Sequence, residues 1–334
     1  MIKYERILIT GGTGSFGKAF IELLLKKLKI KKIKRLVIFS RDEFKQSQLS
    51  KIYPANKYPF IRFFIGDIKD KERLCRAMKN IDLVIHAAAL KQVPAAEENP
   101  METIKTNVLG AQNVIEGSID TKVSNVIALS TDKASSPINL YGATKLCSDK
   151  LFTSAQNYKG FRNINFSVIR YGNVFGSRGS VVPLFLNQFK NKKPLTVTDL
   201  NMTRFNITLN EATRYVLNKI NTNKGGEVFV PKLYSYKIND LIRAIDKNIK
   251  YKVTGIRYGE KLHEEMISVF ENENTLESKD DFIILGSDKN YYRKSTSYKL
   301  VKAGFSYNSF QNSKFLSISQ LKKMIDRENN YFEY

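Results

Sequence analysis

The sequence has no tryptophan, only two cysteines, and no apolar run near the ~20 residues that a bilayer-spanning helix needs. The two cysteines, Cys75 and Cys147, are too few for a disulfide scaffold or a metal cage, so we expect free thiols, no metal and a reducing compartment. No cleavable signal pattern precedes the first apolar stretch, residues 7–9. These absences favour a cytoplasmic protein with no membrane partner.

Acidic residues are few relative to basic ones. The 334 residues include 32 Asp and Glu against 55 Lys and Arg, a formal net charge of +23 that favours anionic partners. The densest basic run, residues 26–35, is interpreted as the solvated end of a helix, where cations complement the helix dipole. A nucleic-acid patch is the alternative reading, but no aromatic and basic recognition motif supports it, and we expect no nucleic-acid partner.

Hydrophobic residues make up 42% of the chain, enough for a buried core in about two domains. Near-continuous apolar strands alternate with helix-like segments, at residues 7–10, 36–39, 61–65, 83–86, 126–129 and 166–169. This pattern predicts an α/β fold with a doubly wound parallel sheet, of the Rossmann type, over residues 1–180. The alternation then loses its regularity. Residues 181–334 are expected to form mainly a smaller substrate-binding lobe, with an amphipathic helix at 317–327 and segments that can return to the first domain.

A glycine-rich turn, TGGTGSFG at residues 10–17, follows the first predicted strand and opens a predicted helix. The backbone N–H groups of such a turn can approach a pyrophosphate at the helix N-terminus. The turn therefore predicts a nicotinamide dinucleotide site, whose residues here are Gly11, Thr13, Gly14, Ser15, Phe16 and Gly17.

The end of the second strand is where NAD and NADP are distinguished. Ser40 and Arg41 come first after this strand, and Lys45 lies one helical turn further on. The forked donors of arginine suit a 2′-phosphate, so NADP is predicted. Asp42 could instead bind a ribose hydroxyl, which leaves NAD as the less favoured alternative.

Segments after the next two strands are expected to line the cofactor. Asp67 and Ile68 would flank the adenine, although a simple helix N-cap is the other reading of Asp67. The small residues Ala87 and Ala88 would let the cofactor lie close to the backbone. Lys91, a little further on, could reach a phosphate or the substrate.

A tyrosine and a lysine four residues apart, Tyr141 and Lys145, share one face of a predicted helix. They follow the strand end Leu129 to Lys133 in a nucleotide-binding fold, which indicates catalysis. Lys145 would lie beside the nicotinamide ribose and lower the pKa of Tyr141. Tyr141 would then take a hydroxyl proton as hydride leaves the adjacent carbon, and both residues would contact the cofactor.

Asp132 and Lys133 place an acid and a second base at the same strand end. They suit β-elimination, in which oxidation at one carbon acidifies its neighbour, a base removes that proton and an acid protonates a departing hydroxyl. Lys133 can be the base only if its pKa is lowered, which burial and nearby Lys145 would favour. A structural ion pair that holds the loop is equally open from local chemistry.

Several independent blocks resemble the extended short-chain dehydrogenases that act on nucleotide sugars. They are SRDE at 40–43, ALKQVP at 89–94, STDKA at 130–134, MTRF at 202–205 and GEKLHE at 259–264. Within this branch the chain is similar to the inverting UDP-N-acetylglucosamine 4,6-dehydratases of pseudaminic acid biosynthesis. These carry Lys at the position of Lys133, where retaining sugar dehydratases typically carry Glu.

The resemblance implies a reaction cycle on UDP-N-acetylglucosamine with tightly bound NADP. Tyr141 deprotonates the 4″-hydroxyl as hydride passes from C4″ to NADP, Lys133 removes the C5″ proton, and Asp132 assists loss of the C6″ hydroxyl as water. Hydride then returns to C6″ and C5″ is reprotonated on the opposite face, giving UDP-2-acetamido-2,6-dideoxy-β-L-arabino-hex-4-ulose. A related dehydratase/5-epimerase of capsule or O-antigen synthesis and a non-catalytic NADP-binding sensor stay open as alternatives. A simple 4-epimerase is less expected, since Asp132 and Lys133 would be idle in it.

The resemblance also implies the remaining contacts. Val174 would touch the cofactor, and the substrate would meet Asn173, three arginines that suit its diphosphate or uridine, and an acid for the uridine ribose, namely Arg178, Arg204, Arg257 and Glu260. Relatives of this kind form homo-oligomers, so a homo-oligomer that takes a UDP-sugar is expected.

Overall fold

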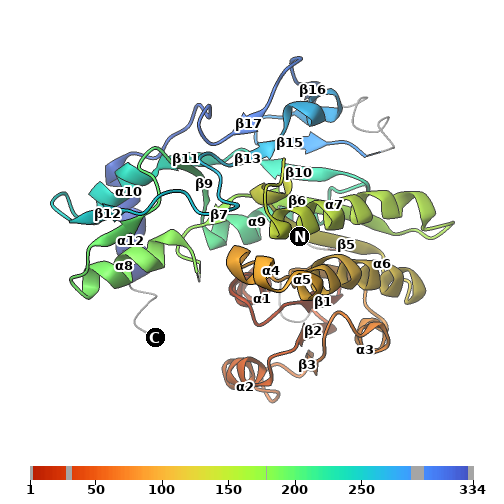
Figure 1. The fold of residues 1–334 in the computed structure, drawn as a ribbon. Helices are drawn as coiled ribbons and strands as arrows, with labels where there is room; N and C mark the ends of the chain where they lie inside the picture. Colours follow the sequence, from red (N-terminus) through yellow and green to blue (C-terminus); the bar gives the residue numbers. More distant parts are fainter. Residues whose placement is uncertain (1–2, 28–31, 178, 287–296, 330–334) are drawn as a thin grey trace.

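The computed structural model describes residues 3–27, 32–177, 179–286 and 297–329, and a ten-stranded sheet forms its centre (Figure 1). The strand order is β16-β14-β15-β10-β6-β5-β4-β1-β2-β3. The strands from β10 to β3 in this order run parallel to one another. They are β1 (Arg6–Thr10), β2 (Arg35–Ser40), β3 (Ile61–Ile65), β4 (Leu83–His86), β5 (Asn125–Thr131), β6 (Asn165–Tyr171) and β10 (Val228–Pro231).

The six strands predicted from apolar runs are all present and belong to this parallel part. Except in the edge strand β3, their apolar side chains are buried on both faces of the sheet, as in β1 and β4, where Leu8, Ile9, Val84 and Ile85 have no exposed surface. Such burial needs helices on both faces, which explains why the strands read as apolar runs and not as alternating ones. The predicted doubly wound α/β fold is confirmed.

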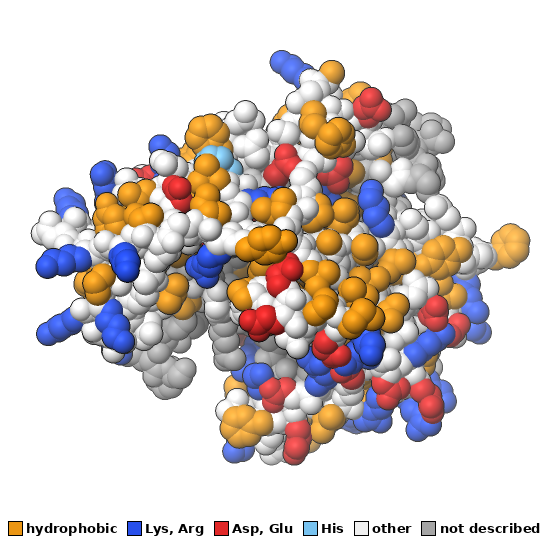
Figure 2. All heavy atoms as spheres, in the orientation of Figure 1, with side chains coloured by type: hydrophobic (Ala, Val, Ile, Leu, Met, Phe, Trp, Pro, Cys, Tyr) orange, Lys and Arg blue, Asp and Glu red, His pale blue; other side chains and the backbone are white. Residues whose placement is uncertain are grey.

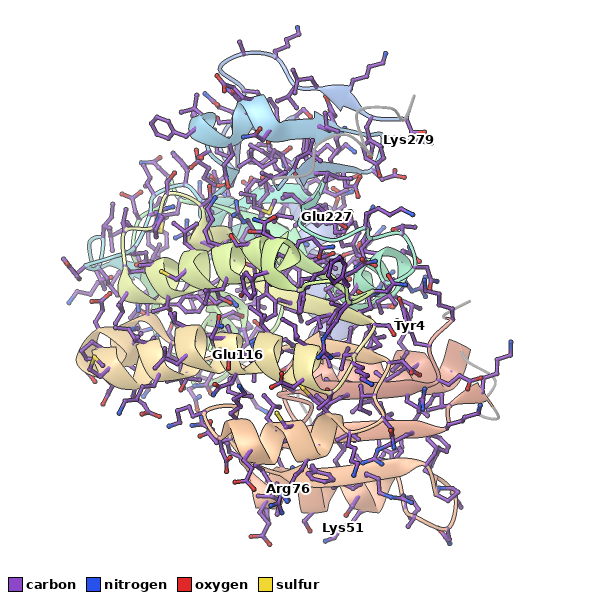
Figure 3. The ribbon with its side chains drawn as sticks, turned by 90° about the vertical axis from the view of Figure 1, so that its right-hand side faces the viewer. Tyr4, Lys51, Arg76, Glu116, Glu227 and Lys279 are labelled. Atoms are coloured by element: carbon purple, nitrogen blue, oxygen red, sulfur yellow. The ribbon has the colours of Figure 1, made fainter. Side chains whose placement is uncertain are left out.

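Helices cover the two faces of the sheet. Seen from the side, three of them lie one above another across one face (Figure 3): α7 (Leu140–Tyr158), α6 (Gly110–Asp120) and α3 (Lys71–Met78). On the other side α1 (Ser15–Lys27) packs against α9 (Leu209–Lys219). Further helices in the described residues of this part are α2 (Glu43–Ile52), α4 (Val93–Glu98), α5 (Pro100–Ile104), the π-helical η2 (Lys105–Leu109) and the short 3-10 helix η3 (Asp132–Ala134). The expected helix end at the basic run is the end of α1; residues 28–31 of the run lie outside the described residues.

A second lobe has its own hydrophobic cluster, centred on Phe185, Leu195, Leu241 and Leu321. It contains α8 (Val181–Lys190), β8 (Leu195–Val197), α10 (Ile238–Ile245) and β12 (Tyr251–Val253), and α12 (Ile318–Asn329), which covers the predicted amphipathic helix. The strands β7 (Asn173–Val174), β9 (Thr203–Ile207) and β11 (Tyr234–Lys237) form a small sheet, and β13 (Glu265–Ile267) pairs with β17 (Tyr307–Asn308).

The chain returns to the main sheet after entering this lobe. Strand β10 pairs with β6, and β15 (Asp281–Ile284), β14 (Thr275–Glu277) and β16 (Lys299–Leu300) extend the edge in antiparallel order. We retain the division at residue 180 as a proposal for the two lobes, with these strands as the return segments.

Basic side chains gather on the second lobe, on the face shown in Figure 2. Exposed lysines at the end of α8 and in the connections before β8 and β12 include Lys190, Lys192, Lys193, Lys247 and Lys250. None of these five lines the cavity described below, so this part of the positive charge is separate from the candidate site.

Candidate active site

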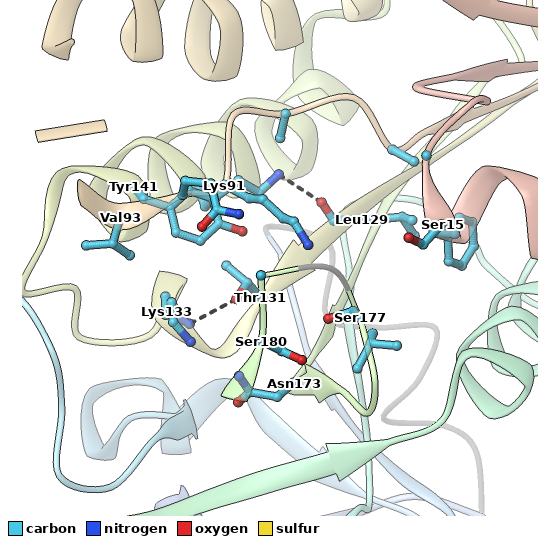
Figure 4. Close-up of a pocket in the computed structure, with 18 of the residues that line it drawn as sticks. Ser15, Lys91, Val93, Leu129, Thr131, Lys133, Tyr141, Asn173, Ser177 and Ser180 are labelled. Carbon is cyan, nitrogen blue, oxygen red and sulfur yellow. Dashed lines mark hydrogen bonds between the residues drawn. The ribbon is translucent and has the colours of Figure 1, made fainter. Parts of the chain in front are cut away.

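A cavity of about 1090 Å³ opens at the carboxyl ends of the parallel strands and extends to the second lobe (Figure 4). Nearly every residue predicted for the site lines it. The exceptions are Asp132, which is buried behind the wall, and Arg178, which lies outside the described residues. Ligands of open α/β sheets bind at this edge, where loops from several strands meet.

The glycine-rich turn forms a close-fitting floor for this cavity. Gly11 has a φ of +65°, and a Cβ at this position would lie 2.9 Å from the Cα of Ala88. A Cβ at Gly17 would lie 2.4 Å from the carbonyl oxygen of Gly12, so the start of α1 packs directly on the turn. Both positions need glycine, and they leave the backbone of the turn open to a ligand. The residues present therefore fit a dinucleotide.

The end of β2 is organised by side-chain contacts. Asp42 caps α2 by accepting a hydrogen bond of 2.9 Å from the backbone N–H of Lys45, and it also pairs with the Lys45 ammonium. Arg41 Nη1 lies 3.4 Å from Asp67 Oδ2, with half of the Arg41 side chain exposed. Ser40 is buried, and its Oγ accepts a hydrogen bond of 3.0 Å from Gln46. Of the two cations at this strand end, Arg41 is therefore more available than Lys45 to bind a ligand.

The loop after β4 is fixed by Asn107 of the π-helical segment. Its Oδ1 accepts from the N–H of Leu90 at 2.8 Å, and its Nδ2 donates to the carbonyl of Leu90 at 2.9 Å and to Thr144 at 3.1 Å. His86 is buried, with its Nδ1 2.8 Å from Thr10 Oγ1, and burial together with nearby Lys145 lowers its pKa to about 3. His86 is therefore a neutral structural group.

Tyr141 and Lys145 lie on one face of α7, as predicted, and both are buried. The Nζ of Lys145 donates a hydrogen bond of 2.8 Å to the carbonyl of Leu129 (Figure 4), and burial lowers the Lys145 pKa. Burial also raises the pKa of Tyr141 to about 12, against the opposing effects of the Lys133 charge and a hydrogen bond with Thr131. The expectation that Lys145 lowers the Tyr141 pKa is therefore wrong for this structure, because burial dominates and Lys133 is the cation that opposes it.

Lys133 lies between two buried carboxylates. Its Nζ is 3.1 Å from Asp132 Oδ1 and 3.0 Å from Glu264 Oε1. Burial alone would lower the pKa of Lys133, but these two carboxylates outweigh it and raise the pKa above the ordinary lysine value. The expected lowering is wrong, because the sequence did not reveal Glu264 as a second anion beside Lys133. Burial meanwhile raises the pKa of Asp132 in spite of its contact with Lys133.

The predicted substrate residues form the opposite wall. Arg204 is buried, and its Nη2 lies 3.5 Å from Glu260, which is also 3.5 Å from Arg257 Nε. Arg257 is mostly exposed at the cavity rim. The Oδ1 of Asn173 is buried, and none of the described residues donates a hydrogen bond to it. An acceptor left open in this way fits a donor on a ligand.

Two site residues were missed from the sequence. Thr131 makes the hydrogen bond with Tyr141 and lines the cavity, and its place directly before Asp132 was the available signal. Glu264 also lines the cavity, but its contact with Lys133 joins residues 131 positions apart, which no local pattern reveals. Within the described ranges, no group of His, Cys, Asp or Glu side chains is arranged to hold a metal ion.

Comparison with known proteins places this site in context. Residues 7–285 match the model of a family described as "Polysaccharide biosynthesis protein". The chain is 48% identical, over 99% of its length and 100% of the relative, to a Campylobacter jejuni subsp. jejuni serotype O:2 protein named UDP-N-acetylglucosamine 4,6-dehydratase (inverting). A Rickettsia conorii protein named UDP-glucose 4-epimerase is 39% identical over 96% of this chain and 95% of its own length. The predicted resemblance is confirmed.

Solved structures agree with the fold. Pen from Bacillus thuringiensis superposes with a TM-score of 0.89 at 40% identity, covering 98% of this chain and 99% of that one. DesIV from Streptomyces venezuelae, a dTDP-glucose 4,6-dehydratase solved with NAD, gives a TM-score of 0.71 at 19% identity over 98% of this chain and 99% of its own. The second likeness shows the fold alone.

Proposed function

The chain belongs to the polysaccharide biosynthesis protein family, of the extended short-chain dehydrogenase fold, and we propose that it is an inverting UDP-N-acetylglucosamine 4,6-dehydratase. The observation that carries this proposal is the grouping of Asp132 and Lys133 with Tyr141 and Lys145 at the end of β5. A 4-epimerase needs only the Tyr–Lys pair. A buried acid and base beside that pair are suited to eliminating water.

Oxidation begins the cycle. A bound nicotinamide would supply the acceptor for the hydride of C4″ and the donor of that hydride to C6″. Tyr141 takes the proton of the 4″-hydroxyl, and its hydrogen bond with Thr131 and the charge of Lys133 stabilise the phenolate that this requires. Lys145, fixed on the carbonyl of Leu129, would hold the nicotinamide ribose.

Elimination follows from the acidity that the 4″-ketone gives to C5″. Because Asp132 and Glu264 raise the pKa of Lys133, it must first give up a proton to act as the base. Its free amine then removes the C5″ proton, and Asp132 protonates the departing C6″ hydroxyl, so one water leaves. Burial raises the pKa of Asp132, which favours its protonated form and suits a general acid. After hydride return to C6″, reprotonation of C5″ on the opposite face gives the L-arabino product, and the cofactor ends unchanged.

NADP is the proposed cofactor. Asp42, the acid that could bind a ribose 2′-hydroxyl, is engaged as the cap of α2 and as the partner of Lys45. Arg41 remains at the cavity with its guanidinium half exposed, where a 2′-phosphate would meet it. NAD, which the DesIV structure contains, is the alternative.

The substrate diphosphate and uridine are assigned to the second lobe. Arg204 and Arg257 supply charge-assisted donors at the cavity wall and rim, Glu260 accepts ribose hydroxyls, and Asn173 contacts the sugar. Lys91 lines the cavity, and desolvation lowers its pKa; it is proposed to contact the substrate beside the cofactor. Arg178 belongs to the same proposal.

The place of the reaction in the cell is also a proposal. We assign it to an early step of pseudaminic acid synthesis, carried out by a cytoplasmic homo-oligomer. No helix in the described part of the chain is both long and apolar enough to cross a bilayer. The dehydratase/5-epimerase of capsule or O-antigen synthesis differs from this assignment in product stereochemistry and later steps.

The test is NMR of the purified protein with UDP-N-acetylglucosamine in deuterated water, first without added cofactor. A C6″ methyl signal with deuterium at C5″ and the L-arabino configuration is expected. A D-configured 4-keto product would keep the dehydratase and overturn the role of Lys133. No reaction, even with NADP added, would contradict the proposed substrate and favour another nucleotide sugar or the sensor.

A further inference from the structure

Glu264 is a buried carboxylate in the wall of the cavity that the reaction cycle above does not use. It directly precedes β13, and its side chain is only 3% exposed. Its backbone is fixed by Ser309: the N–H of Glu264 donates to Ser309 Oγ at 2.9 Å, and the N–H of Ser309 donates to the Glu264 carbonyl at 2.7 Å. Glu264 is therefore a rigidly held anion.

Negatively and positively charged side chains alternate along a line from Asp132 and Lys133 to the second lobe. Lys133 Nζ lies 3.1 Å from Asp132 and 3.0 Å from Glu264 Oε1, and the same Oε1 lies 3.8 Å from Arg204 Nε. Arg204 in turn lies 3.5 Å from Glu260. Glu264 is thus the link between the proposed base and an arginine of the proposed diphosphate site.

One oxygen on each of the two carboxylates beside Lys133 has no donor among the described residues. Oε2 of Glu264 and Oδ2 of Asp132 are buried, and no described residue donates a hydrogen bond to either. A buried acceptor without a donor is unfavourable in a structural ion pair. The open oxygen on Asp132 suits a group that must gain and lose a proton. Among the described residues, the ion-pair partners of the Glu264 carboxylate are Lys133 and Arg204.

We propose that Glu264 is a positioning residue for the elimination step, because it holds Lys133 against Asp132. Its ion pair with Arg204 keeps Glu264 ionised, so that Asp132, and not Glu264, exchanges a proton with Lys133. This inference rests on the proposed roles of Lys133 and Asp132. In the exchange an N–H bond of the Lys133 ammonium breaks and an O–H bond forms on the Asp132 carboxylate. The free amine then takes the C5″ proton, and the Asp132 acid gives its proton to the departing C6″ hydroxyl.

The proton inventory agrees with this assignment. Burial raises the pKa of Asp132, whereas Lys133 and Arg204 outweigh burial at Glu264 and lower its pKa. Asp132 is therefore the better acceptor of the two carboxylates that touch Lys133. The other titratable or charged groups near Lys133 are Tyr141 of α7, Tyr236 of β11, Arg204 of β9 and Lys261 of the loop before β13.

The first experiment needs no substrate. Glu264→Gln keeps the size of the side chain and removes its charge, and Glu265→Gln is the matched control, because Glu265 accepts hydrogen bonds from Ser135 and Ser136 and not from Lys133. Competitive acetylation of Lys133 at pH 8.5, read by peptide mass spectrometry, reports its free-amine fraction. We expect Glu264→Gln to raise the acetylation rate of Lys133 at least about tenfold, since one pKa unit changes that fraction tenfold. Equal rates in the wild type and Glu264→Gln would overturn the proposal.

The second experiment separates oxidation from elimination. With UDP-N-acetylglucosamine and NADP, Glu264→Gln should retain the transient absorbance of the reduced nicotinamide but lose at least about tenfold in C5″ deuterium exchange. General loss of structure would also expose Lys133 and stop exchange, so retained formation of the reduced nicotinamide in the same variant is the result that a misfolded protein does not give. Equal losses in both steps would show a structural role only and contradict the proposal.

A conservative variant guards against misfolding. Glu264→Asp keeps the charge and is expected to recover the low acetylation rate of Lys133 and part of the exchange. If this variant labels like Glu264→Gln, charge at the position is not what matters and the proposal is wrong. If the wild type leaves UDP-N-acetylglucosamine unchanged, the proposed function fails, while the acetylation result still decides the link between Glu264 and Lys133.

Discussion

Lys145 on α7 donates a hydrogen bond of 2.8 Å from its Nζ to the carbonyl of Leu129, one residue before the polar end of β5. The contact joins residues 16 positions apart, and it places the amine at the carboxyl end of the sheet, where the cofactor is expected. The carbonyl of Leu129 thereby orients the side chain that we propose holds the nicotinamide ribose.

The first prediction concerns this contact. Lys145→Met should lower kcat for the dehydratase reaction at least about 100-fold, the usual scale for loss of a group in proton transfer, and should weaken dinucleotide binding. Turnover by NMR and NADP binding by calorimetry measure the two effects. Lys150→Met, on an exposed face of the same helix, is the control and should behave like the wild type. Full activity in Lys145→Met would remove Lys145 from the mechanism.

Tyr141 is expected to act in oxidation and therefore in every later step. Tyr141→Phe removes only the hydroxyl that is hydrogen-bonded with Thr131, and should slow formation of the reduced nicotinamide at least about 100-fold. Stopped-flow absorbance at the start of the reaction is the measurement. Tyr158→Phe, near the end of the same helix and half exposed, is the matched control. Normal turnover of Tyr141→Phe would refute the assignment.

Lys133 is expected to act after oxidation. Lys133→Met should leave NADP binding intact, because Lys133 is held by Asp132 and Glu264 and not by the glycine turn. It should abolish exchange of the C5″ hydrogen with solvent. Deuterium incorporation by NMR measures the exchange, and oxidation in the same variant serves as the internal control. Exchange at the wild-type rate would exclude Lys133 as the base.

Much of the fold could be predicted from the sequence because its signals are local. The strands of a parallel sheet are buried on both faces, so β1, β2 and β4 each carry an unbroken apolar run that ends at a polar residue. The glycine turn is likewise specified by neighbours in the chain. The return of β14 and β15 to the sheet depends on pairing with strands far away in sequence, and their short, mixed segments carried no such signal.

The pKa values of the site residues were harder to predict than which residues belong to the site. Tyr141 and Lys133 are recognisable from spacing, but their pKa values depend on burial and on charges brought in by the fold. Burial decides the direction at Tyr141, and Glu264, from a loop distant in sequence, helps to decide it at Lys133. Arguments from spacing alone gave the wrong direction for both groups.

Buried His86 should make stability depend on pH. Because burial lowers its folded pKa to about 3, while an unfolded histidine titrates near 6.5, its contribution to stability is fully present above about pH 6.5 and is lost as pH falls toward 3. His86 alone contributes a slope of about 1.4 kcal/mol per pH unit in this window. His86→Asn should remove that slope, measured by urea unfolding between pH 7 and 5 at one protein concentration. The same slope in the variant and the wild type would show that His86 is not the neutral buried group.

Arg41 is expected to decide the choice of cofactor. The guanidinium is half exposed at the cavity, and its nearest described acid is Asp67 at 3.4 Å, so it can turn to a 2′-phosphate without leaving a buried charge unpaired. Arg41→Ala should weaken NADP binding about tenfold or more and leave NAD binding within about twofold, since a charge-assisted hydrogen bond contributes about 1.5–3 kcal/mol. Calorimetry with both dinucleotides measures the ratio. Arg73→Ala is the control, because Arg73 is bound to the carbonyl of Ile65 and does not line the cavity. If Arg41→Ala weakened the binding of NADP and NAD equally, Arg41 would not contact the 2′ position. If the wild type bound NAD more tightly than NADP, Asp42 would be the residue to test next.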